Sequence, residues 1–319
     1  MIKLPEFKPA WWLRNPHMQT MWNETMRGKN PLFLEHERLE LPCGDFVDLA
    51  SCKKGQDKNV LILPGLGGTA DSAYIQGMAR ALLEHNFNII IMHFRGYGKT
   101  PNRLPQMFHG GQTSDLFEVI RYLKSIFPGD PLFAVGFSIG GNILLKYLGE
   151  QAEHSGLAAA VAISVPFFLN KTQEHLSKGF AQIYQHYLLL KLKAAMVRKL
   201  LHLKHDNLDL WSICLARDML QFDELVTVPQ HGFKNAQDYY ARSSSHGYLK
   251  SISTKTLIIH AEDDPFLPAQ AIPAPKEVSQ TTDLLITKHG GHVGFISGPT
   301  PRTPVYWLDQ AVPAYLKEL

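Results

Sequence analysis

Six short runs of consecutive apolar residues recur along the chain, and this pattern restricts the possible folds more than any other feature. The runs cover residues 59–64, 88–94, 131–137, 157–164, 256–261 and 283–288. Helical patterns separate the first four, at about residues 72–85, 114–127 and 139–149. Strands that alternate with helices indicate a mostly parallel sheet covered on both faces, and strands buried on both faces are apolar throughout. We therefore predict an α/β fold.

Two parts of the chain depart from this alternation. Residues 1–34 are aromatic and proline-rich without a clear period, and we expect an extended N-terminal arm. Residues 165–249 lack a buried-strand pattern, and we expect a helical cap between two strands of the core. The core would then comprise residues 35–164 and 250–319. It would begin with a hairpin, because "EHERLEL" and "DFVDLASC" flank the turn "PCGD".

Composition narrows the class of protein and its setting. The chain has 319 residues, of which 45% are hydrophobic, enough for one large domain with an insertion. Its formal net charge of +3 is too weak to indicate a nucleic-acid partner. The three cysteines show no metal-type spacing, and we expect neither a disulfide framework nor a metal. With no signal-peptide or membrane-spanning pattern, we expect a cytoplasmic location.

One serine lies between two glycines where a predicted strand meets a predicted helix. Gly136-Phe137-Ser138-Ile139-Gly140 matches the G-x-S-x-G pattern of a nucleophile, and the pattern requires this strand-turn-helix context. The turn exposes the Ser138 hydroxyl at a helix N-terminus, which favours developing negative charge. The backbone N–H of Ile139 is then a candidate donor to an oxyanion. The alternative is a simple turn with a capping serine.

A glycine-rich stretch follows the first apolar run. Gly65-Leu66-Gly67-Gly68 would let the backbone approach Ser138, so the N–H of Leu66 is the candidate second oxyanion donor. The same residues, extended to Ala70, also fit the dinucleotide-binding fingerprint. That fingerprint needs an acidic residue at the end of the next strand, which here ends in "IMHFRG". We therefore favour the oxyanion loop over a nicotinamide site.

A serine nucleophile needs a base and a group that orients the base. In α/β hydrolases these follow the serine in the order acid, then histidine. Asp264 ends a buried run before the rigid turn "PFLP", with Asp263 as the alternative acid. His292 lies among glycines near the end of the chain, with His289 as the alternative base. We expect three other histidines to be structural groups with satisfied hydrogen bonds: His93, His109 and His260.

Longer motifs resemble one family. The segments "NPHMQT", "PNRLPQMFHGGQTSD" and "FDELVTVPQHGFKNAQDYYARSSS", together with the serine elbow, resemble the YheT-like (AB hydrolase-4) branch of the α/β-hydrolase superfamily. The resemblance implies an eight-stranded, mostly parallel sheet with a helical cap insertion. It also implies a catalytic triad of Ser138, Asp264 and His292 without a cofactor. Members of the family are regarded as carboxylesterases or lipid-acting hydrolases.

These observations predict a serine hydrolase that cleaves short-chain or lipid acyl esters through an acyl-enzyme. The alternative is a non-catalytic protein of the same fold that binds an acyl ligand or a protein partner. The predicted cap carries seven lysines and arginines against one glutamate over residues 171–205, so peripheral contact with anionic lipid is a further hypothesis. An ordinary cap helix with solvated lysines is the simpler one. For His17, we favour anchoring of the arm over a place at the site entrance.

Overall fold

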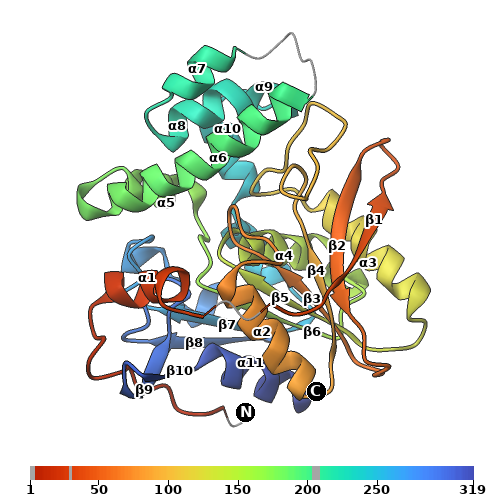
Figure 1. Ribbon diagram of the computed structural model, residues 1–319, viewed down its shortest axis with the longest axis vertical. Coiled ribbons are helices and arrows are strands. Elements are labelled where there is room, and N and C mark those ends of the chain that lie inside the picture. Colours follow the sequence, from red (N-terminus) through yellow and green to blue (C-terminus); the bar gives the residue numbers. More distant parts are fainter. Residues whose placement is uncertain (1–3, 29–30, 203–208) are drawn as a thin grey trace.

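Eight strands form one sheet in a computed structural model that describes residues 4–28, 31–202 and 209–319 (Figure 1). Their order is β1-β2-β4-β3-β5-β6-β7-β8. The β1–β2 and β2–β4 pairs are antiparallel, and the five pairs from β4–β3 to β7–β8 are parallel. The strands are β1 (Glu35–Glu40), β2 (Phe46–Cys52), β3 (Asn59–Leu63), β4 (Asn88–Met92), β5 (Leu132–Phe137), β6 (Ala159–Ile163), β7 (Lys255–Ala261) and β8 (Thr282–Thr287). The predicted α/β fold and its hairpin are confirmed.

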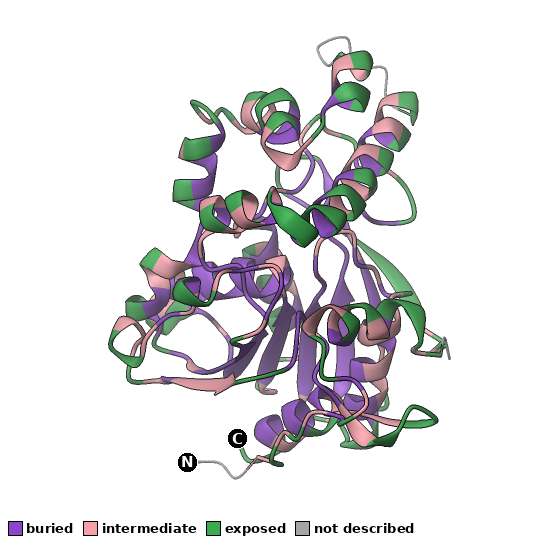
Figure 2. Cartoon of the chain, turned by 90° about the vertical axis from the view of Figure 1, so that its left-hand side faces the viewer, coloured by how far each residue is buried: buried purple, intermediate pink, exposed green. Residues whose placement is uncertain are grey.

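Helices cover both faces of the sheet, which explains why its central strands are apolar throughout. Val60 and Ile62 of β3 pack in one cluster with α2 (Ala73–Glu84) and α11 (Leu308–Lys317). The alternate residues of β3 pack on the opposite face with α3 (Ser114–Ile126) and α4 (Ile139–Gln151). The central strands β3, β4 and β5 are accordingly buried along their length (Figure 2). Adjacent side chains of a strand point to opposite faces, so each of these central strands contributes to both clusters.

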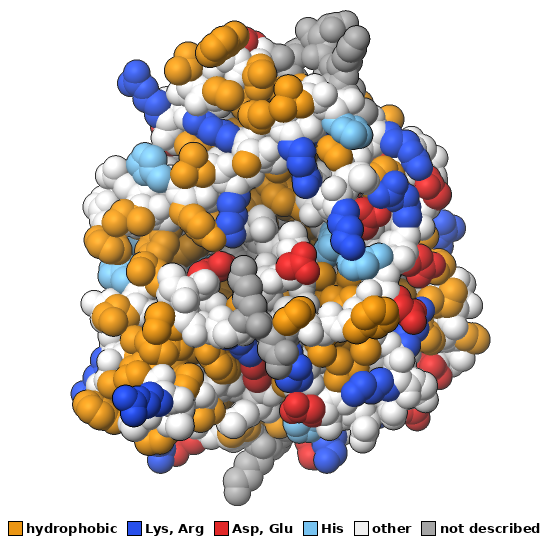
Figure 3. Space-filling view, in the orientation of Figure 1, with side chains coloured by type: hydrophobic (Ala, Val, Ile, Leu, Met, Phe, Trp, Pro, Cys, Tyr) orange, Lys and Arg blue, Asp and Glu red, His pale blue; other side chains and the backbone are white. Residues whose placement is uncertain are grey.

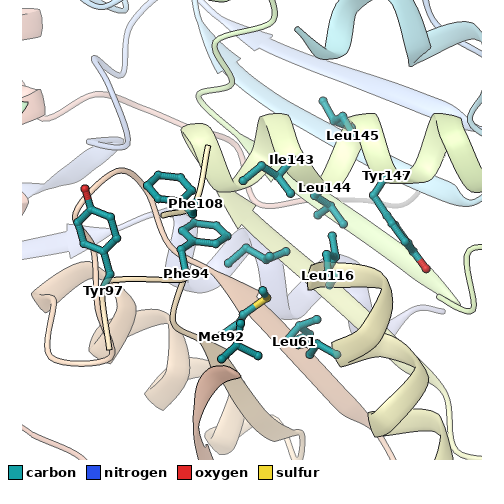
Figure 4. Close-up of a cluster of buried hydrophobic side chains, with 14 of the residues drawn as sticks. Leu61, Met92, Phe94, Tyr97, Phe108, Leu116, Ile143, Leu144, Leu145 and Tyr147 are labelled. Carbon is teal, nitrogen blue, oxygen red and sulfur yellow. The ribbon is translucent and has the colours of Figure 1, made fainter. Parts of the chain in front are cut away.

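The cluster under α4 fixes the helix that follows Ser138 (Figure 4). Leu61 and Met92 from the sheet lie beside Leu116 of α3 and Ile143 and Leu144 of α4. The N-terminus of α4 is therefore held by packing on both the sheet and α3.

The described part of the N-terminal segment, residues 4–28 and 31–34, is not extended throughout, contrary to our expectation. Residues Pro16–Thr25 form a helix, α1. The Asn15 side chain accepts hydrogen bonds from the N–H groups of His17 and Met18, and Pro16 occupies the first helical position. The helix has no apolar stripe because the side chains that it buries, Gln19 and Asn23, are polar. Hydrophobic periodicity therefore misses it.

The sequence analysis also did not predict the C-terminal elements that follow the His292 loop. Strands β9 (Ile296–Thr300) and β10 (Thr303–Tyr306) form a separate two-stranded sheet, and α11 follows them. Both strands are partly exposed, and each contains a proline, which weakens the strand pattern. They lead the chain from the His292 loop back to α11 under the main sheet.

The chain between β6 and β7 is helical where the structure describes it. Its helices are α5 (Leu169–Leu176), α6 (Gln182–His202), α7 (Leu210–Leu215), α8 (Met219–Phe222), α9 (Val228–His231) and α10 (Ala236–Ser243). They lie together above the sheet in Figure 1, and hydrophobic side chains gather on their outer surface in Figure 3. Among the described residues, no helix combines the length and hydrophobicity needed to span a bilayer.

Candidate active site

Ser138 lies in a strained turn between β5 and α4. Its backbone has a φ of 51° and a ψ of −121°, a conformation that non-glycine residues rarely adopt. The neighbouring glycines are required by close approach. A Cβ atom at Gly140 would lie 2.4 Å from the Pro64 carbonyl oxygen, and one at Gly136 would lie 2.7 Å from the Gly140 carbonyl oxygen. The turn therefore has the strand-turn-helix geometry that G-x-S-x-G predicts.

Ser138, His292 and Asp264 form a continuous hydrogen-bonded chain. His292 Nε2 lies 2.9 Å from Ser138 Oγ, and His292 Nδ1 lies 2.8 Å from Asp264 Oδ2. A carboxylate only accepts hydrogen bonds, so Nδ1 donates to Asp264. In the neutral ring Nε2 is then the acceptor, and it can receive the Ser138 proton. This is the arrangement expected of a nucleophile, a base and an orienting acid.

The environment keeps Asp264 ionised. Burial alone would raise its pKa, but the adjacent His292 and the hydrogen bonds that Asp264 accepts hold the pKa below its usual value. One of these bonds comes from the Phe266 N–H, which lies 2.8 Å from Asp264 Oδ1. The Phe266 ring also stacks on the His292 ring, with 3.8 Å between centroids and 2° between planes. Phe266 thus orients both Asp264 and His292. Our sequence analysis did not include Phe266 in the site, although its position in the "PFLP" turn next to Asp264 could have indicated this role.

The alternative acid and base lie outside this chain of hydrogen bonds. His289 Nδ1 lies 3.2 Å from Asp263 Oδ2, and half of the His289 side chain is exposed. The other carboxylate oxygen of Asp263 accepts from the Gly291 N–H at 2.9 Å. Asp263 therefore holds the loop that carries His292, and His289 pairs with Asp263 at the surface. The structure brings Asp264 and His292, not this second pair, to Ser138.

Our expectation of satisfied hydrogen bonds is wrong for His260 and only half met by His93. His93 and His109 each accept a hydrogen bond from a backbone N–H, those of Ala70 and Gly111, but the buried Nδ1 of His93 has no hydrogen-bond partner among the described residues. His260 is fully buried on β7, and neither ring nitrogen makes a hydrogen bond within the described structure. Its Nε2 lies 3.7 Å from Asp264 Oδ2, and burial lowers its pKa to about 4, so the ring is neutral. The ring also packs against Phe167, with 5.6 Å between centroids.

The glycine-rich loop after β3 lies beside the serine. A Cβ atom at Gly65 would lie 3.4 Å from the Ser138 Cβ, so the loop approaches the turn closely. Leu66 and Ile139, whose N–H groups are the predicted oxyanion donors, line the same cavity as Ser138. This juxtaposition is what an oxyanion site formed by two backbone segments requires.

Ser138 opens into a cavity of about 550 Å³ that is lined by α1, by loops at the end of the sheet and by the helices between β6 and β7. Most of the cavity wall is apolar. The helices and loops between β6 and β7 contribute, among others, Leu169, Leu176, Leu188, Leu192, Phe222 and Val226. A cavity of this size suits a ligand with a sizeable apolar part.

This fold, with a strained serine at the end of its fifth strand and a histidine after its eighth, defines an α/β hydrolase. Residues 58–299 match the family model described as the alpha/beta hydrolase fold. The chain belongs to this family. We therefore reject the hypothesis that the glycine-rich loop after β3 is a dinucleotide-binding site.

Named proteins resemble the chain over nearly its full length. It is 39% identical to "Putative esterase YheT" of Escherichia coli, over 98% of this chain and 93% of that protein. It is 28% identical to phospholipase ABHD3 of Mus musculus, over 98% of this chain and 78% of that protein. A solved structure of the Pyrococcus furiosus esterase Pf2001 shares the fold, with a TM-score of 0.58 at 18% identity, over 100% of this chain and 96% of that chain. The resemblance to the YheT-like branch is confirmed.

Proposed function

We propose that this α/β hydrolase is a serine esterase in which Ser138 attacks the carbonyl carbon of a carboxylic ester. The observation that carries the proposal is the hydrogen-bonded chain from Ser138 Oγ through His292 to Asp264, at 2.9 and 2.8 Å. Relatives named esterase and phospholipase agree with an esterase- or lipase-like hydrolase.

The first half of the reaction forms an acyl-enzyme. His292 Nε2 takes the Ser138 proton while Oγ bonds to the carbonyl carbon, and the carbonyl oxygen becomes an oxyanion. The N–H groups of Leu66 and Ile139 would donate to that oxygen. The intermediate then collapses, the carbon–oxygen bond to the alcohol breaks, and His292 returns the proton to the leaving alkoxide. Asp264 stabilises the positive charge that His292 carries between these steps.

The second half repeats this chemistry with water. His292 removes a proton from a water molecule, whose oxygen attacks the acyl carbon. Collapse of the second tetrahedral intermediate releases the carboxylic acid, and His292 returns the proton to Ser138 Oγ. Besides the ester and water, these proton transfers need only the side chains of Ser138, His292 and Asp264.

The cavity favours esters with an apolar acyl chain. Its wall is mostly apolar and includes Leu188, Leu192 and Phe222, and burying one methylene group contributes about 0.8 kcal/mol. We therefore expect kcat/KM to rise with acyl-chain length until the cavity is filled.

Hydrolysis of p-nitrophenyl esters with acyl chains of two to twelve carbons tests the proposal. Ser138→Ala should abolish turnover at every chain length while the thermal unfolding midpoint stays close to that of the wild type. Undiminished hydrolysis by a folded Ser138→Ala protein would overturn the proposed nucleophile.

A further inference from the structure

The loop that carries His292 has an unfavourable backbone. Gly291 has a φ of 60°, Val293 a φ of 57° and Phe295 a φ of 48°. Positive φ is uncommon for residues with side chains and a clear outlier for a β-branched residue such as Val293. Such conformations persist only where the surrounding structure holds them. Some other part of the molecule must therefore hold this loop in place.

Helix α1 supplies the hydrogen bond to the backbone of His292 itself. Thr20 Oγ1 accepts from the His292 N–H at 2.9 Å and donates to the Pro16 carbonyl oxygen at 2.8 Å. Because the hydroxyl hydrogen bonds its own helix, the oxygen lone pair stays directed at His292. Thr20 thus links the helix to the proposed base over a separation of 272 residues.

Two further side chains of α1 hold the rest of the loop. Gln19, which is fully buried, accepts from the Ile296 N–H at 2.7 Å and donates to the Ile296 carbonyl oxygen at 3.0 Å. Its amide thus pairs with the loop as a neighbouring strand would. Asn23 donates to the Val293 carbonyl oxygen at 2.7 Å. The buried face of α1 is polar, so hydrophobic periodicity does not predict the helix, and this same face binds the loop.

The glycines of the loop permit this close contact. A Cβ atom at Gly291 would lie 2.6 Å from the Pro16 carbonyl oxygen, and one at Gly294 would lie 2.6 Å from the Gln19 carbonyl oxygen. The backbones of the helix and the loop therefore touch directly. Any side chain at these two positions would push the loop, and His292 with it, away from α1.

We propose that α1 positions the base of the site and that Thr20 is a positioning residue acting through the backbone of His292. This inference rests on the proposed function, because it concerns the same histidine. It also accounts for the segment "NPHMQT", which the reaction itself does not use. Asn15 and Pro16 start the helix, and Gln19 and Thr20 hold the loop. His17 Nδ1 lies 3.0 Å from the Tyr184 hydroxyl, so His17 ties α1 to the cap.

The test compares Thr20→Val with two matched variants. Valine keeps the branched shape of threonine but removes the acceptor for the His292 N–H. We expect kcat and the rate at which a small fluorophosphonate labels Ser138 to fall about 10- to 100-fold, as for a small displacement of a reacting group. KM should change less than twofold. Thr20→Ser keeps the hydroxyl and should restore most of both rates.

Asn15→Ala separates positioning from helix stability. It removes the N-cap of α1 but leaves the Thr20 contact in place. It should lower the unfolding midpoint yet leave the labelling rate within about twofold of the wild type. If Thr20→Val labels at the wild-type rate, or if Asn15→Ala slows labelling as strongly as Thr20→Val, the positioning proposal is wrong. An unlabelled wild type would instead overturn the proposed function, and this inference with it.

Discussion

At the scale of single residues, neighbours a few ångströms away decide which titratable group does the chemistry. Asp263 and Asp264 are adjacent in the chain, yet only Asp264 bonds the histidine that reaches Ser138. Asp264 is buried and kept ionised by His292, whereas the partly buried Asp263 contacts the half-exposed His289 and a backbone N–H. The same contrast separates His292 from His289.

Asparagine substitutions at the two acids test this assignment. Asp264→Asn should reduce kcat by about 10⁴, the loss seen when the orienting acid of a serine protease is replaced by its amide. Asp263→Asn is the matched control, and its kcat should stay within about tenfold of the wild type. Steady-state hydrolysis of p-nitrophenyl butyrate measures both. A larger loss for Asp263→Asn than for Asp264→Asn would reverse the assignment.

At the scale of elements, α6 lines part of the cavity and bonds to the chain after β4. Three of its four lysines and arginines bond to groups of this chain: Lys193 to the Cys214 and Ala216 carbonyl oxygens, Arg198 to those of Gly96 and Gly98, and Lys199 to Asn102 and the Gln106 carbonyl oxygen. Three of the seven lysines and arginines over residues 171–205 that suggested lipid contact are thus directed at the protein. Contact with a membrane stays a prediction.

Leu188 on α6 offers a test of the acyl cavity. It lines the cavity, so Leu188→Trp should fill space that a long chain needs. We expect kcat/KM for the twelve-carbon ester to fall about tenfold or more, with little change for acetate. Leu190→Trp on the same helix is the control, because Leu190 is 65% exposed. An equal loss for the short and the long ester would contradict the assigned acyl site.

The buried Lys199 of α6 makes the free energy of unfolding depend on pH. Burial lowers its pKa to about 7, although Asp45 opposes the shift. Between pH 7 and the ordinary lysine value of about 10.4, the unfolded chain binds more protons than the folded one, so stability rises with pH in this window. The contribution is at most about 1.4 kcal/mol per pH unit.

Unfolding free energies measured between pH 6 and 9 test this effect. Lys199→Met should show a smaller rise above pH 7 than the wild type, whatever its absolute stability. Identical slopes for the two proteins would show that Lys199 stays charged in the folded state.

At the scale of the whole molecule, elements with a local sequence pattern could be predicted from the sequence, whereas contacts between distant segments could not. Alternating apolar runs predict the sheet because each strand must be covered on both faces. The glycines around Ser138 and the order of acid and histidine predict the site because close approach and strand-end position leave traces in short motifs. Helix α1 leaves only the start signal Asn15-Pro16 and no apolar stripe, since its buried side chains are polar, and its partners in the His292 loop lie about 270 residues away.

The missed hydrogen-bonding state of His260 has the same origin. Its ring packs against Phe167 of a distant segment and stays 3.7 Å from Asp264 Oδ2, which is beyond hydrogen-bonding distance. A sequence pattern places a histidine on a strand but does not fix distances of this kind. Conversely, the "PFLP" turn is local, and it could have identified Phe266 as the residue that orients both Asp264 and His292.

The central claim is that Ser138 is an activated nucleophile. Intact-mass spectrometry after treatment with a fluorophosphonate, followed by peptide mapping, tests it most directly. The account predicts one added phosphonyl group per chain, located on Ser138, absent in Ser138→Ala and formed far more slowly in His292→Ala. An unmodified wild-type protein, or a label on another residue, would contradict it.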